Sequence, residues 1–73
     1  MTDLNEIRAL KASFQGALET ASALEALKPR VMALDPAADV TPDDLEELGR
    51  VTLAHAVSSQ ALRGLVEAMR ARR

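Results

Sequence analysis

The residues best suited to chemistry lie in one short stretch, VTLAHAVSSQAL, at positions 51–62. It holds the single histidine, His55, followed by Ser58 and Ser59 at spacings that share a helix face. A serine beside a histidine can begin a nucleophilic site, but catalysis also needs an orienting acid and oxyanion donors. No glycine-rich turn precedes either serine, so we predict no catalytic residues and no enzyme.

Two other roles are open to His55. It can be a polar notch in a packing surface, filling the space opposite Ala17 and Ala21. It can also make an association site sensitive to pH, because histidine titrates near neutrality. We favour the notch, because the small side chains of Ala17 and Ala21 leave space for a histidine.

The remaining charged clusters have simple helical explanations. Carboxylates crowd residues 43–47, where they suit the start of a helix, and RARR at 70–73 suits a helix end. The sequence contains no phosphate loop, dinucleotide fingerprint or metal-ligand signature. We therefore expect no cofactor and no bound metal.

Length and composition favour a small helical protein that depends on association. A chain of 73 residues forms one small domain and buries only about 60% of its unfolded surface. Disulfides are excluded because there is no cysteine, so association is the leading source of added stability. A net charge of −2 argues against nucleic-acid binding, and no apolar run is long enough for membrane insertion. Without a visible secretory signal, we expect a cytoplasmic protein.

The apolar spacing predicts a first helix over about residues 3–34. Asp3, followed by Glu6 three residues later, forms a cap pattern, and Thr2 is an alternative cap. Pro29 interrupts the pattern, so the helix breaks or kinks there, and we favour a kink that lets it continue to Leu34.

A connection over 35–41 and a second helix over about 42–70 complete the chain. The connection contains Asp35-Pro36-Ala37-Ala38, which is typical of a short turn. Thr41 followed by Pro42 is a strong helix start, and Val40 can pack on Leu45 across it.

Two long helices with a short connection predict an all-α, antiparallel two-helix hairpin, completed by dimerisation or a partner protein. Pairing about the connection places Ile7 near Met69, Leu10 near Val66, Phe14 near Leu62 and Val31 near Leu45. Ala17 and Ala21 then lie opposite Ser59 and His55. The predicted core comprises Ile7, Leu10, Phe14, Leu24, Val31, Leu45, Leu48, Leu62, Val66 and Met69.

Apolar and small residues remain outside this core. Glycine within a helix costs about 1 kcal/mol relative to alanine, so the helical glycines suggest close approach by another chain. We predict a second packing surface for self-association into a four-helix bundle or for a partner protein. Its residues are Gly16, Leu53, Val57, Ala61, Gly64 and Ala68.

The stretch VTPDDLEELGRVTLAHAVSSQALRGLVEAM, residues 40–69, resembles the second helix of the small co-chaperones of the type III secretion needle protein. That family forms an antiparallel helical hairpin, and its second helix has a Ser/Thr/Cys-Pro start and an alanine-rich stripe. The resemblance implies a bacterial cytoplasmic protein that helps a larger helical-repeat chaperone keep the needle subunit soluble. Pro29 and the two-proline connection depart from the family pattern. The needle subunit itself is also similar, but its typical aromatic residues are missing.

Together these patterns predict a non-enzymatic protein–protein interaction module, best described as a small chaperone or adaptor subunit that binds a helical partner. One alternative is a small anti-activator or regulator that masks a transcription or signalling factor. The other is a self-assembling four-helix-bundle dimer.

Overall fold

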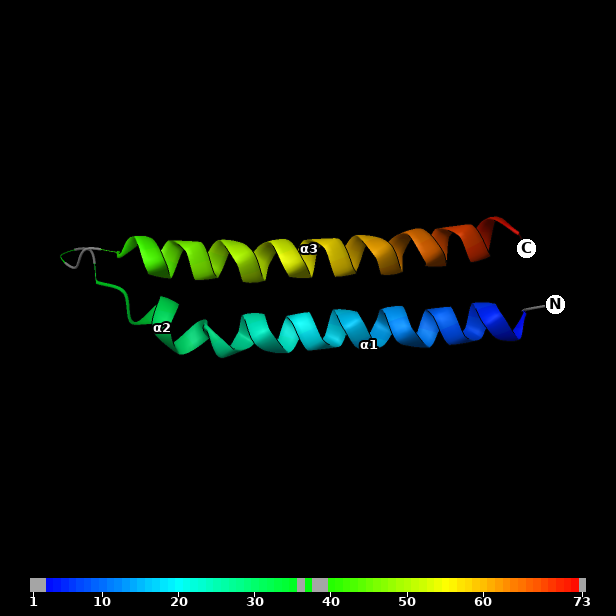
Figure 1. Ribbon diagram of the computed structural model, residues 1–73, viewed down its shortest axis with the longest axis horizontal. Coiled ribbons are helices and arrows are strands. Elements are labelled where there is room, and N and C mark those ends of the chain that lie inside the picture. The colour runs from blue at the N-terminus through cyan, green and yellow to red at the C-terminus, as the bar shows by residue number, and fades with distance from the viewer. Residues whose placement is uncertain (1–2, 36, 38–39, 73) are drawn as a thin grey trace.

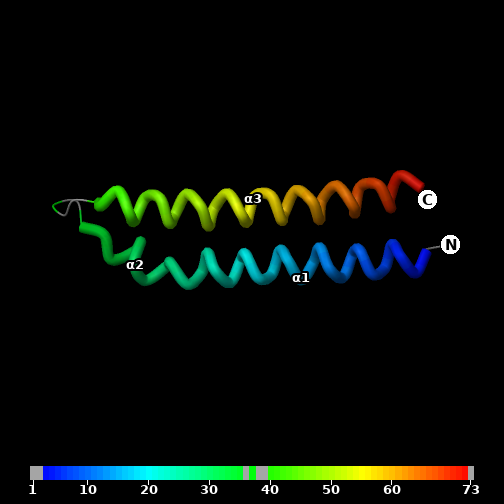
Figure 2. The backbone as a smooth tube through the Cα atoms, viewed as in Figure 1, coloured from blue at the N-terminus to red at the C-terminus, as the bar shows by residue number. Residues whose placement is uncertain are grey.

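The computed structural model describes residues 3–35, 37 and 40–72, and every secondary-structure element in that range is an α-helix, which confirms the predicted class. Two long helices, α1 (Leu4–Ala26) and α3 (Pro42–Ala71), run antiparallel along each other (Figure 1). A short helix, α2 (Lys28–Met32), follows α1 at the turn end (Figure 2). The molecule is an elongated hairpin, 57 Å long and 17 Å across.

Side-chain caps begin both long helices. The Asn5 N–H donates to the Asp3 carboxylate at 3.1 Å, and the Asp44 N–H donates to the Thr41 hydroxyl at 3.2 Å. These bonds satisfy N–H groups that lack a partner within the helix. Both predicted caps are confirmed, whereas the alternative cap, Thr2, lies outside the described residues.

The first helix breaks at Leu27, two residues before Pro29. Proline has no N–H to donate to the Glu25 carbonyl, and its ring crowds the preceding turn. Just before the proline, the Leu27 N–H donates to the Leu24 carbonyl at 3.1 Å, a tighter bond to the third preceding residue. The chain then turns into α2. The interruption predicted at Pro29 is therefore a break at Leu27, and helical structure ends at Met32 rather than at Leu34.

Part of the connection is held by a side chain. The Ala37 N–H donates to the Asp35 carboxylate at 2.9 Å, which is an Asx-type turn contact. Pro36 and Ala38, which belong to the predicted turn, lie outside the described residues.

Where α1 and α3 meet, their residues follow a seven-residue repeat, with the positions facing the partner labelled a and d. The register is marked by a hydrogen bond between Thr20 Oγ1 and His55 Nδ1 at 3.0 Å. Thr20 is the neighbour of Ala21, so this contact lies within one helical turn of the predicted pairing of Ala21 with His55. We call these facing positions the seam; apart from Leu27 they are Glu6, Leu10, Ser13, Ala17, Thr20, Leu24, Asp44, Leu48, Val51, His55, Ser58, Leu62, Leu65 and Met69, all half-buried.

Half of the predicted core is exposed in the hairpin, so the prediction is wrong for those residues in this structure. The exposed fractions are 37% for Ile7, 53% for Phe14, 39% for Val31, 57% for Leu45 and 38% for Val66. Except for Val31, which lies in α2, each occupies position e, directly after a d residue. Two helices bury only the narrow a/d stripe of each, whereas the apolar pattern here is wider. Leu10, Leu24, Leu48, Leu62 and Met69 lie in the seam.

Among the described residues, only Leu27 is buried, with 8% of its surface exposed. Leu27→Ala removes this contact at the turn end, and we expect it to lower the free energy of unfolding by about 2 kcal/mol or more. Urea unfolding followed by far-UV circular dichroism measures the change. Leu53→Ala is the matched control, because Leu53 is 65% exposed. Equal effects of the two substitutions would contradict the assigned core.

Candidate protein-interaction surfaces

One side of the hairpin carries exposed aliphatic and aromatic side chains. In the same repeat, position g directly precedes an a residue and position b directly follows one. In an antiparallel pair, the e positions of both helices lie on one side, with the b positions beside them, and the g positions lie on the other side. The exposed fractions on the e side range from 37% to 60%. We call this side the apolar face; it comprises Leu4, Ile7, Phe14, Leu18 and Val66.

A groove on the apolar face reaches toward the seam. It has a volume of about 170 Å³ and is lined by Leu10, Val66, Met69 and Arg70. Because Leu10 comes from α1 and the other three from α3, the groove lies between the two helices. A third element could therefore insert apolar side chains between α1 and α3.

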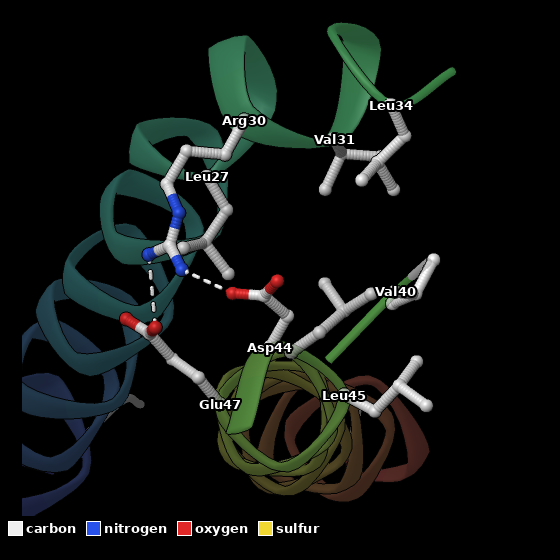
Figure 3. Close-up of a pocket in the computed structure, with 9 residues that line it drawn as sticks. Leu27, Arg30, Val31, Leu34, Val40, Asp44, Leu45 and Glu47 are labelled. Atoms are coloured by element: carbon white, nitrogen blue, oxygen red, sulfur yellow. Dashed lines mark hydrogen bonds and ion pairs between the residues drawn. The ribbon is translucent and has the colours of Figure 1, made fainter. Parts of the chain in front are cut away.

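A second hollow lies at the turn end, between α2 and the start of α3 (Figure 3). Its volume is about 140 Å³, and its apolar wall consists of Leu27, Val31, Leu34, Val40, Leu45 and Leu48. Val40 and Leu45 both line this hollow, and their packing on each other across the Thr41 cap stays a prediction. The hollow is large enough for one apolar side chain.

Arg30 closes one edge of this hollow by bridging two carboxylates of α3 (Figure 3). Its Nη2 lies 2.8 Å from Asp44 Oδ1, and its Nη1 lies 2.9 Å from Glu47 Oε2. These partners are 14 and 17 residues away along the chain, so only the break at Leu27 and the hairpin register bring them together. Sequence reasoning missed this cluster because no local spacing signals it.

The bridge changes the ionisation of its members. Hydrogen bonding from the Thr41 side chain, followed by that from Arg30, lowers the pKa of Asp44 below its ordinary value. Hydrogen bonds to Glu47 and then Asp44 raise the pKa of Arg30. Because the folded-state pKa of Asp44 is depressed, its contribution to stability is present above the unfolded pKa. That contribution is lost as pH falls through the folded pKa.

We expect Thr41→Ala and Arg30→Ala each to move the pKa of Asp44 up toward its ordinary value, because each removes a hydrogen bond to the carboxylate. Both substitutions should also reduce the loss of helix stability on acidification. Carbon-detected NMR titration of the Asp44 carboxyl measures the shift. Arg50→Ala is the control, since Arg50 is no partner of Asp44. An unchanged pKa in both test variants would contradict the bridge.

His55 lies in the seam, held between the two helices. His55 Nδ1 and Thr20 Oγ1 are hydrogen-bonded at 3.0 Å, and the Thr20 hydroxyl also lies 3.0 Å from the Ala17 carbonyl oxygen. On the other side of the ring, His55 Nε2 and Ser59 Oγ are hydrogen-bonded at 3.4 Å. The group orienting the imidazole is a hydroxyl rather than a carboxylate. The arrangement fits a polar notch, and the absence of catalysis stays a prediction.

The predicted packing surface lies away from the seam. Leu53 and Val57 are 65% and 61% exposed, and Ala61, Gly64 and Ala68 are exposed as well, while Gly16 is half-buried. A Cβ added to Gly16 or Gly64 would meet no neighbouring atom within 4 Å. These glycines are therefore not required for packing within the hairpin. We call the predicted surface (Gly16, Leu53, Val57, Ala61, Gly64 and Ala68) the small-residue face, and its role in association stays a prediction.

The exposure of Phe14 predicts the effect of its removal. Phe14→Ala should lower the free energy of unfolding of the isolated chain by less than about 1 kcal/mol, because little of its contact surface lies within the hairpin. The same urea titration measures this, with Leu27→Ala as the destabilising reference. A loss near 3 kcal/mol would place Phe14 in a core.

No protein-family model, curated protein or solved structure matches the chain. In the described part of the chain, no helix is long and apolar enough to cross a bilayer.

Proposed function

We propose that the chain is a non-enzymatic interaction module that binds a helical partner protein, in the manner of a small chaperone or adaptor subunit. One observation supports this most directly. The chain exposes 5944 Å². A compact monomer of 7.8 kDa is expected to expose about 4,400 Å². The excess of roughly 1,500 Å² is more than the 800 Å² that each partner buries in a typical protein–protein interface.

The weakness of the seam supports the same proposal. Polar side chains occupy several facing positions, including Glu6, Ser13, Thr20 and Ser58. Burial of apolar area provides most of the stability of a small domain, and this seam buries little. A binding partner that covers the exposed apolar residues would add that stability by linkage.

The more specific form, a chaperone subunit in type III secretion, rests on the resemblance of residues 40–69 to the needle co-chaperones. The two alternatives are an anti-activator that masks a transcription or signalling factor, and a self-assembling four-helix-bundle dimer. The identity of a co-purified partner separates the first two, and the mass in solution identifies the third.

We expect the isolated chain to be a weakly stable helical monomer with a broad urea transition. Sedimentation velocity over a range of concentrations measures the mass, and far-UV circular dichroism measures helicity. A tagged chain expressed in its native host should retain one stoichiometric partner, whose addition sharpens and raises the unfolding transition. A tight homodimer would support the bundle alternative. A cooperative, stable monomer without a partner would contradict the proposal.

A further inference from the structure

The apolar residues of α1 extend beyond the seam on one side. Ile7 and Phe14 occupy e positions, and Leu4 and Leu18 widen the stripe on the same side, whereas the g positions carry Ala9, Gly16 and Ala23. The d positions of α1 are polar, so its apolar stripe runs along the a and e positions and is centred beside the seam, where a second neighbour could contact it. α3 is one neighbour, and the apolar face is open to a second.

The groove on this face has the position that a third helix needs. Its lining includes Val66, which is exposed, and Leu10 and Met69, which are half-buried in the seam. A helix packed along the groove would insert a row of aliphatic side chains between α1 and α3. It would also cover Phe14, the only aromatic residue of the chain, and aromatic residues are frequent energetic anchors of interfaces.

Charge indicates the chemistry of that helix. Lys11, Arg63 and Arg70 are exposed at b positions beside the apolar face. In residues 4–21 and 56–71, all of which the structure describes, no carboxylate occupies a b or e position. On the adjoining flank, Glu67 Oε1 lies 3.5 Å from Arg70 Nη1. A second copy docked through this region would bring the same three cations together, which disfavours a homodimer. A helix with acidic flanks would complement them.

Building on the proposed function, we infer that the apolar face binds an acidic amphipathic helix of a partner protein and forms a three-helix bundle with it. Apolar residues of that helix fill the groove beside Leu10 and Val66 and cover Phe14. Its carboxylates lie beside Lys11 and Arg63.

The test uses a displayed library of amphipathic helical peptides as the probe. Their apolar stripe is constant, and the flanking positions vary among Glu, Gln and Lys. Selection on the full, immobilised chain should enrich Glu over Lys at those positions. A selected pool that is neutral or rich in Lys overturns the inference.

Variants of the chain then locate the site with one selected acidic peptide, measured by fluorescence anisotropy. Phe14→Ala should weaken binding by about tenfold or more, as should the double variant Lys11→Glu with Arg63→Glu. Leu53→Ala and Arg50→Glu are matched controls on other sides of α3, and both should bind normally. Circular dichroism verifies that each variant remains helical. Retained binding in both test variants overturns the inference.

Other outcomes separate this inference from the proposed function. Binding that survives Phe14→Ala but is lost in Ala61→Glu overturns the apolar face as the site and leaves an interaction module at the small-residue face. Phe14-dependent binding to vesicles containing phosphatidylserine, without peptide binding, overturns the helix in favour of a membrane surface. A Phe14-dependent homodimer overturns it in favour of a second copy. Recovery of no peptide from a cooperatively folded, stable monomer contradicts both proposals.

Discussion

Two helices can remove only a narrow stripe of each other from water, and this geometric limit determines most features of the hairpin. α1 and α3 meet through a and d positions, and their e positions stay exposed whatever residues occupy them. In this chain, larger apolar residues such as Phe14 and Ile7 occupy e, while Ser13 and Glu6 occupy the adjacent d positions. The chain therefore has more apolar surface than one helix pair can bury, and on α1 this excess lies on the side of the e positions.

At the turn end, the chain buries a side chain by changing direction rather than through the contact between the two long helices. Pro29 forces the chain out of α1, and the new direction brings Leu27 against the start of α3, where it is the best-buried residue described. The same change of direction sets Arg30 against two carboxylates of the first turns of α3. Since all three side chains remain partly exposed, the bridge defines geometry more than it supplies stability. The break thus locates the hairpin end without requiring a large core.

The helix caps could be predicted from the sequence. Which apolar residues lie in the seam and which lie on the surface could not. Asp3 and Thr41 are caps because their hydroxyl or carboxylate oxygen can reach a nearby N–H, which depends on a few residues only. Choosing between Phe14 and Ser13 for the seam depends on how many helices surround α1, and hydrophobicity alone favours Phe14. The prediction of a core containing Ile7, Phe14 and Val66 suits a helix with additional neighbours, and it fails for an isolated pair. The bridge at Arg30 was not predictable, because it requires the break and the register together.

The polar centre of the seam has a consequence for how the hairpin can associate. Thr20, His55 and Ser59 form a hydrogen-bonded set that is satisfied at one register, and a shift of α3 along α1 would separate Thr20 from His55. An entirely leucine-lined seam would lack this restriction and could pair with other helices or with a second copy at several registers. Polar residues in the seam therefore favour one alignment at the expense of stability. The apolar residues that could supply the missing stability lie outside the seam, where only another molecule can cover them. Residues that fix the alignment of the hairpin and residues left uncovered by it therefore lie on different faces of the same two helices.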